Sequence, residues 1–162
     1  MERLHRLEWL HIKNPVYFVT FCTEGRRTIL AHQSVHGAFV HFCHEALKRD
    51  IFVGRSILMP DPIHLLVKLP PPSKNPSRWI KSLKNCLSKA LRCCNVVAPH
   101  WQKGFFDHVL RSTESYSEKW LYMVENSVRA GLVTDWTPWP YQGEIQPLRL
   151  DESLRRSQTA AT

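Results

Sequence analysis

The residues best suited to chemistry lie in the segment EKWLYMVENSVRAGLV, residues 118–133. Tyr122 and Asn126 are four residues apart, so in a helix they share a face, and a phenol oxygen and an amide oxygen can point to one place. Arg129 follows one turn later on the neighbouring side. A phenol oxygen can act as a nucleophile. Taken alone, however, Tyr122 would fit a core or interface position, so the segment predicts a site only if other residues join it.

A second candidate is His64, in the apolar segment MPDPIHLLVKLP at residues 59–70. Side chains of a strand alternate between its two faces, so two histidines spaced two residues apart can bind one metal ion. Position 62, where the partner histidine would stand, is occupied by Pro62. His64 is therefore either the remaining half of a metal-binding pair or an ordinary strand histidine.

Other reactive patterns are missing from the sequence. The chain has five cysteines without a C-x-x-C pair, and Cys93 and Cys94 are adjacent. This usage predicts reduced thiols rather than a disulfide framework or a zinc knuckle. No dinucleotide-binding G-x-G-x-x-G, Walker A or G-x-S-x-G pattern occurs, so nucleotide binding and serine hydrolysis are not indicated.

The elements that must position these residues follow from apolar periodicity and turn residues. Strands are predicted at residues 16–23, 51–59, 63–69 and 104–111, and the second and third of these should form a hairpin. Helices are predicted from a cap at Ser34 to about Arg49, from Ser77 to about Leu91, and from a capping box at Ser115 to Gly131.

The order strand, helix, strand, strand, helix, strand, helix predicts an α+β fold. It is that of a ferredoxin-like split β-α-β sandwich, an antiparallel sheet with two helices on one face, plus a C-terminal helix that carries Tyr122. We predict one domain over residues 1–150, in which the irregular segment from Trp136 to Pro140 packs back on the body. Residues 151–162 are predicted to be a disordered tail.

The charge of the chain favours a polyanionic partner. The 162 residues contain 22 Lys and Arg against 14 Asp and Glu, a formal net charge of +8, which favours nucleic acid first and an anionic membrane second. The helix from Ser77 has an apolar face, and no acidic residue occurs from Ser73 to His100, so its opposite face is suited to phosphate contact as well as to solvent. That opposite face carries Arg78, Lys81, Lys84, Lys89 and Arg92.

Neither a membrane span nor a signal peptide is indicated. No apolar run approaches the roughly 18 residues that a transmembrane helix needs, and the N-terminal segment MERLHRLEWLHIK has no apolar core. We therefore predict a soluble, cytoplasmic protein without a membrane partner.

Four segments, taken in order and at their separations, resemble one known family. They are MPDPIHLLVKLP, SRWIKSLKNCLSKAL, WQKGFFDHVLRSTESY and YMVENSVRAGLV. Together they resemble the IS200-like, single-tyrosine HUH transposases, and most of all the branch called REP-associated tyrosine transposases. The resemblance extends from about Asn14 to the tryptophans near the end of the chain, and it implies a ferredoxin-like fold.

The resemblance also implies roles for the candidate residues. In that family, two histidines separated by a hydrophobic residue bind a divalent ion, and a side chain four residues after the tyrosine is a further ligand. Carried over, Tyr122 is the nucleophile, and His64 and Asn126 are ligands of Mg²⁺ or Mn²⁺, which would polarise the scissile phosphate. Pro62 replaces the first histidine; a bulge there could bring in the carboxylate of Asp61 instead.

DNA contacts are predicted from the basic helix, from aromatic rings suited to stacking on bases, and from the family's pattern around the fourth strand. The DNA-binding residues predicted in this way are Arg78, Trp79, Lys81, Lys84, Lys89, Trp101, His108, Arg111 and Arg129.

Two functions of different classes follow. The first is a transposase that binds single-stranded or hairpin DNA and cleaves and rejoins it through a 5′-phosphotyrosine. The second is a DNA-binding descendant that has lost cleavage, which Pro62 favours. A third, an RNA-binding module that stacks bases on the strand YFVTF, lacks the basic and aromatic RNP1 run. The protein could act as a monomer or a homodimer.

Overall fold

The computed structural model describes residues 15–71, 73, 75–110, 113–131 and 133–148, and for residues 113–115 it describes the backbone alone. Its elements, with 3-10 helices labelled η, follow in chain order: β1 (Val16–Phe21), η2 (Glu24–Arg26), α2 (Gln33–Ala46), η3 (Leu47–Arg49), β2 (Phe52–Leu58), β3 (Ile63–Lys68), α3 (Ser77–Cys93), β4 (Phe106–Leu110), α4 (Thr113–Arg129) and β5 (Gln142–Glu144).

The strands form one antiparallel sheet in the order β4-β1-β3-β2-β5. Its first four strands, with α2 and α3 as the crossover helices, confirm the predicted ferredoxin-like arrangement. The hairpin of β2 and β3 is confirmed as well, because Leu58 pairs with Ile63 and the Met59 amide donates to the carbonyl of Pro62 at 3.1 Å. The fifth strand was not predicted.

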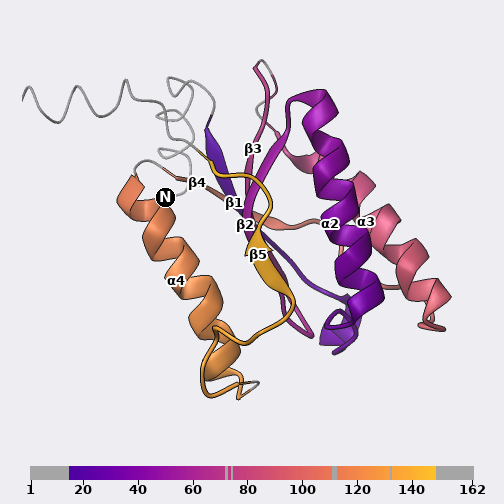
Figure 1. Ribbon diagram of the computed structural model, residues 1–162. Helices are drawn as coiled ribbons and strands as arrows, with labels where there is room; N and C mark the ends of the chain where they lie inside the picture. The colour runs from indigo at the N-terminus through magenta and orange to yellow at the C-terminus, as the bar shows by residue number, and fades with distance from the viewer. Residues whose placement is uncertain (1–14, 72, 74, 111–112, 132, 149–162) are drawn as a thin grey trace, which may run out of the picture.

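The sheet lies between two layers of helix (Figure 1): α2 and α3 cover one face, and α4 covers the other. Ile63, Leu65 and Val67 of β3 belong to the core under α2 and α3, whereas Leu66 belongs to the core under α4. The strict alternation of a strand therefore turns His64 toward α4. Among the helices of the described residues, none is long and apolar enough to span a membrane.

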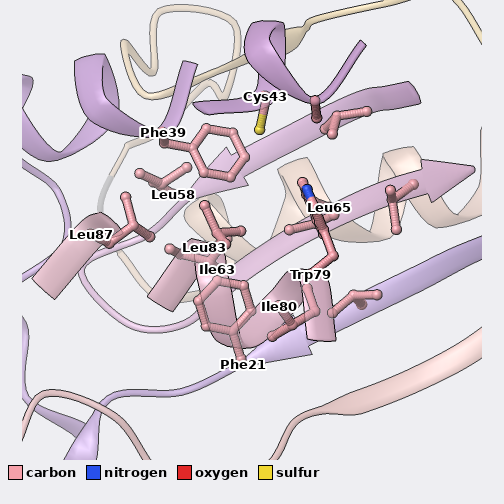
Figure 2. Packing of buried hydrophobic residues seen from close by; sticks show 14 of the residues in the cluster. Phe21, Phe39, Cys43, Leu58, Ile63, Leu65, Trp79, Ile80, Leu83 and Leu87 are labelled. Carbon is pink, nitrogen blue, oxygen red and sulfur yellow. The ribbon is translucent and has the colours of Figure 1, made fainter. Parts of the chain in front are cut away.

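The larger core fills the space between the sheet and the two crossover helices (Figure 2). Phe39 and Cys43 of α2 meet Leu83 and Leu87 of α3 in this cluster, and all four side chains are fully buried. The helix spacing of the apolar residues was thus predicted correctly. The N-terminal cap of α2 was not, because His32 is the cap and its Nδ1 accepts from the Ser34 amide at 3.1 Å.

The chain after α4 returns to the sheet. Gly131 adopts a left-handed conformation (φ 71°), as predicted for the residue that ends this helix. Trp136 and Trp139 then pack against the core under α4, and the Trp139 indole N–H donates to the carbonyl of Leu58 at 3.1 Å. The predicted packing of this segment is confirmed, whereas the predicted disordered tail lies outside the described residues.

Candidate functional site

Tyr122 lies in the middle of α4, where its ring contacts residues of the sheet. Lys119, Tyr122, Asn126 and Arg129, spaced three, four and three residues apart, form a stripe along one side of the helix. The neighbouring side is buried in the core. The Tyr122 side chain remains 46% exposed, and its ring meets the rings of Phe18 and His64 edge-on, with centroids 6.4 Å away in both cases. Tyr122 is thus open to solvent although its ring contacts the sheet.

His64 lies directly beneath this stripe and is only 5% exposed. Its ring stacks on Phe18, with centroids 5.7 Å apart. Its Nδ1 lies 2.7 Å from Thr20 Oγ1, and its Nε2 lies 3.4 Å from Asn126 Nδ2. Burial lowers the pKa of His64 to about 4, so the imidazole is neutral at neutral pH and one ring nitrogen keeps its lone pair. The structure therefore brings Tyr122, His64 and Asn126 together, as the sequence predicted.

As a metal site, this arrangement is incomplete. His64 and Asn126 supply two uncharged donors, and Pro62 supplies none. Among the described residues, no group of three or more His, Cys, Asp and Glu side chains could hold a metal ion. Mg²⁺ requires about six ligands in octahedral geometry and favours oxygen. The residues present do not fit a site with three side-chain ligands.

Asp61 does not complete the set. Its Oδ1 accepts from the Thr23 amide at 2.7 Å, and its Oδ2 forms a short ion pair with Arg26 Nε. The Asp61 side chain is 3% exposed, while that of Arg26 is 61% exposed. Both carboxylate oxygens are therefore engaged in holding the β2–β3 loop against the end of β1. These contacts give Asp61 a role in the fold, and its role as a metal ligand stays a prediction without support from this arrangement.

Two cations lie beside the Tyr122 ring. Lys119 Nζ is 5.7 Å from the centroid of Tyr122 and 5.4 Å from that of Phe18. Arg129 Cζ is 5.1 Å from the Tyr122 centroid, and its Nη2 donates to the Tyr122 carbonyl at 3.4 Å. Arg129 was among the predicted DNA contacts, but Lys119 was missed. Its position three residues before the tyrosine, on the same helix stripe, is the signal that could have identified it.

Strand β4 adds residues from the edge of the sheet. Phe106 pairs with Thr20, which in turn pairs with His64, and His108 pairs with Phe18. Paired residues of neighbouring strands point to the same face of a sheet, so Phe106 and His108 lie on the face that α4 covers. Phe106 is 64% exposed, and it was not predicted as a site residue. The signal was the pair of adjacent phenylalanines in GFFD, because successive residues of a strand point to opposite faces and only one of the two can face the core under α2 and α3. Arg111 lies outside the described residues.

The other basic residues lie elsewhere. Arg78, Lys81 and Lys89 are exposed on α3, which covers the face of the sheet opposite to α4 (Figure 1). The structure thus separates the basic helix from Tyr122. Lys84 differs from the other three, because its ammonium donates to the carbonyls of Gln102 (3.1 Å) and Gly104 (2.5 Å) and burial lowers its pKa. Its contacts fix the loop before β4, rather than leaving the charge free for phosphate.

The two predicted stacking tryptophans also serve the fold. Trp79 is 7% exposed and packs against Phe42, with ring centroids 5.8 Å apart. A stacking role for Trp79 is therefore corrected, since its ring is part of the core. Trp101 is half-buried against Phe21, and its indole N–H bonds the carbonyl of Lys84 at 3.1 Å and Ser88 Oγ at 2.9 Å.

Comparison with known proteins agrees with this fold. A REP-associated tyrosine transposase of Escherichia coli (strain K12) is 26% identical over 137 residues, covering 81% of this chain and 77% of that protein. The solved structure of a REP-associated tyrosine transposase bound to a REP hairpin shares the fold, with a TM-score of 0.66 at 21% identity over 87% of this chain and 93% of that one.

The family model described as "Transposase IS200 like" matches residues 11–119. The match spans β1 to β4 and the first part of α4, and ends before Tyr122. It covers well over half of the chain, and with it the sheet that carries His64. The protein therefore belongs to the IS200-like transposase family.

Proposed function

We propose that this protein is a transposase that binds a single-stranded DNA hairpin and cleaves and rejoins the strand beside it through Tyr122. The observation that carries the proposal is the half-exposed Tyr122, whose ring contacts His64 between α4 and the sheet, with Asn126 beside that histidine. A solved relative of the same fold was bound to a REP hairpin, which supports a hairpin as the ligand.

The proposed reaction is an exchange of phosphoester bonds. The Tyr122 oxygen bonds to the phosphorus and loses its proton, while the bond from phosphorus to the 3′ oxygen breaks. The 3′ oxygen leaves with the electron pair and takes up one proton, giving a 5′-phosphotyrosine and a free 3′-hydroxyl. Because the covalent link conserves the energy of the phosphodiester, another 3′-hydroxyl can reverse the attack without a nucleotide cofactor.

Mg²⁺ or Mn²⁺ remains a prediction for this chain, and His64 and Asn126 are the side chains that would hold the ion. When bound, it would polarise a phosphate oxygen. Both residues also help to position the tyrosine. The His64 ring packs edge-on against the Tyr122 ring, and the Asn126 amide contacts His64 Nε2 from α4.

The DNA is proposed to contact both faces of the sheet. Arg78, Lys81 and Lys89 on α3 can neutralise phosphates of the hairpin stem. A strand that reaches Tyr122 from there must pass an edge of the sheet, and β4, with Phe106 and His108, forms one edge. Contact with phosphate through Arg111 stays a prediction.

A second function, DNA binding without cleavage, is favoured by one observation. Pro62 provides no metal ligand. In addition, Asn126 Nδ2 lies 3.4 Å from His64 Nε2, so these two polar groups pair with each other rather than with an ion. A protein of this kind would keep the hairpin-binding surface and the tyrosine, but would form no covalent intermediate.

An assay for the covalent adduct tests both functions. Labelled hairpins from the DNA that flanks the gene are incubated with Mn²⁺ or Mg²⁺ and the wild type, Tyr122→Phe or Pro62→His, and adducts are separated on a denaturing gel. We expect an adduct with the wild type that is lost in Tyr122→Phe. An adduct formed by Pro62→His alone would establish the second function, and hairpin binding without any adduct in all three proteins would contradict cleavage.

A further inference from the structure

We infer that Lys119 and Arg129 form a phosphate clamp beside Tyr122, a binding site for a single phosphodiester of an unpaired DNA strand. The inference rests on the proposed function and extends it, because it names the residues that would neutralise the phosphate at the tyrosine. Lys119 was not among the site residues predicted from the sequence.

The two cations converge on the ring from opposite ends of the helix stripe. Lys119 precedes Tyr122 by three residues and Arg129 follows it by seven, so their backbones lie about 15 Å apart along the axis. Both side chains nevertheless reach the same ring, at 5.7 and 5.1 Å from its centroid. A phosphate beside the Tyr122 ring would therefore lie close to two positive charges.

Neither cation is neutralised by the protein in the part that the structure describes. No ion pair joins Lys119 or Arg129 to a described acidic side chain, whereas Arg26, Lys48 and Arg55 each have one. Glu118 and Glu125 of α4 are exposed, and Glu125 precedes Arg129 by four residues, the spacing of helix ion pairs. Among the described residues, however, neither glutamate forms an ion pair with Lys119 or Arg129. The cations thus keep their charge available to an anion from outside.

The clamp would also supply positive charge that the other side chains of this site do not provide. Pro62 stands where the family's pattern has a metal-binding histidine, and among the described residues no group of three His, Cys, Asp or Glu side chains could hold a metal ion. Attack on a phosphodiester adds negative charge to its oxygens, and preorganised cations stabilise such charge most when they are held in place beforehand. The contacts of Lys119 with the rings of Phe18 and Tyr122, and that of Arg129 with the Tyr122 carbonyl, provide such placement.

A purely structural role for the two cations makes a different prediction. Cation–π contacts at an exposed site hold a ring but do not sense the charge of the DNA. The two roles can therefore be separated by removing charge from the DNA rather than from the protein.

The experiment uses the full chain with Tyr122→Phe, which keeps the ring and prevents cleavage. Binding is measured by fluorescence anisotropy for synthetic hairpins with a single-stranded extension, in which one phosphate at a time is replaced by an uncharged methylphosphonate. At one linkage of the extension we expect binding to weaken about tenfold, the effect of losing charge-assisted contacts to one group. Adding Lys119→Gln or Arg129→Gln should abolish this difference, while Lys119→Arg and Arg129→Lys should retain it.

Lys48→Gln is the matched control, because Lys48 is an exposed cation on η3, directly after α2, that pairs with Glu45 away from α4. It should leave the tenfold difference intact. If Lys119→Gln and Arg129→Gln keep the wild-type melting temperature and the full difference, the clamp is overturned and the proposed function stands. If no linkage is sensitive although the hairpins bind, the clamp is also overturned. If the protein binds no hairpin, the proposed function fails and the clamp fails with it.

Discussion

The His64 imidazole connects the sheet to α4 through Phe18, Thr20 and Asn126. Burial lowers its pKa from 6.5 to about 4; the charge of Asp61 opposes this shift and that of Arg26 adds to it, both by less than burial. In the unfolded chain the ring takes up a proton near pH 6.5, whereas in the folded protein it resists until about pH 4. The unfolded state therefore binds more protons between these two values.

His64 should for this reason make the protein less stable in acid. Its contribution is fully present above about pH 6.5 and is lost as the pH falls to about 4, by roughly 3 kcal/mol in all. Urea unfolding at a series of pH values in EDTA, compared between the wild type and His64→Leu, isolates this contribution. A difference in unfolding free energy that is independent of pH would contradict a neutral, buried His64.

Asp61 should affect stability rather than chemistry. Replacement by alanine leaves the Thr23 amide without its acceptor and should lower the free energy of unfolding by about 1–3 kcal/mol. Asp61→Asn, which keeps an acceptor for Thr23 and loses the charge facing the exposed Arg26, should cost less. Urea denaturation measures both. Wild-type stability of Asp61→Ala combined with loss of adduct formation would restore Asp61 to the active site.

The face on which a side chain lies could be predicted from the sequence where the periodicity of its helix or strand determines it. Tyr122 and Asn126 share a face in any helix, and His64 must point to one side of its strand, so their meeting required only that α4 lie on that side. The partners of Asp61 and Lys84 could not be predicted. They depend on loops that the sheet brings together across 38 and 20 residues of sequence.

At the scale of elements, β4 contributes more to the site than its sequence indicated. It lies at one end of the sheet order and places Phe106 in the same row as Thr20 and His64. Two strand spacings, about 10 Å, separate Phe106 from His64. An exposed aromatic ring at that distance can stack on an unpaired base next to the phosphate at Tyr122.

We therefore expect Phe106→Ala to weaken binding of hairpins with a single-stranded extension by about 1–3 kcal/mol, with little effect on hairpins that lack one. Phe106→Trp should retain binding. Phe52 is the matched control, an exposed phenylalanine that pairs with Lys68 at the far end of β3. Binding titrations with an abasic nucleotide at each position of the extension would show which base is stacked. Equal effects of Phe106→Ala on both kinds of hairpin would contradict stacking.

Elements with a clear hydrophobic pattern were predicted, and those without one were missed. Strands β1 to β4 and helices α2, α3 and α4 of the described residues lie within a few residues of their predicted limits. Strand β5 has the sequence QGE, which lacks β-branched and aromatic residues, and it exists because β2 offers it an edge. Long-range pairing of this kind leaves no signal in a short segment.

At the scale of the whole molecule, the decisive feature is that α3 and α4 lie on opposite faces of the sheet (Figure 1). The order of elements predicts which helices cross between strands but not which face a later helix covers. The proposed DNA contacts therefore fall on two surfaces: the cations of α3 on one side, and Lys119 and Arg129 beside Tyr122 on the other. A duplex stem and its unpaired flank are the two parts of a hairpin substrate that could occupy them.

Two separate surfaces should act independently on binding. Replacing Lys81 and Lys89 by glutamine should lower the slope of log affinity against log salt by about 0.9 for each stem phosphate released, with or without an extension. Lys119→Gln should change binding only when the extension is present. Because the sites lie on opposite faces, their effects should add to within about 0.5 kcal/mol in the triple variant. Anisotropy titrations at several salt concentrations test this, and a larger coupling would mean that both sets of cations contact the same stretch of DNA.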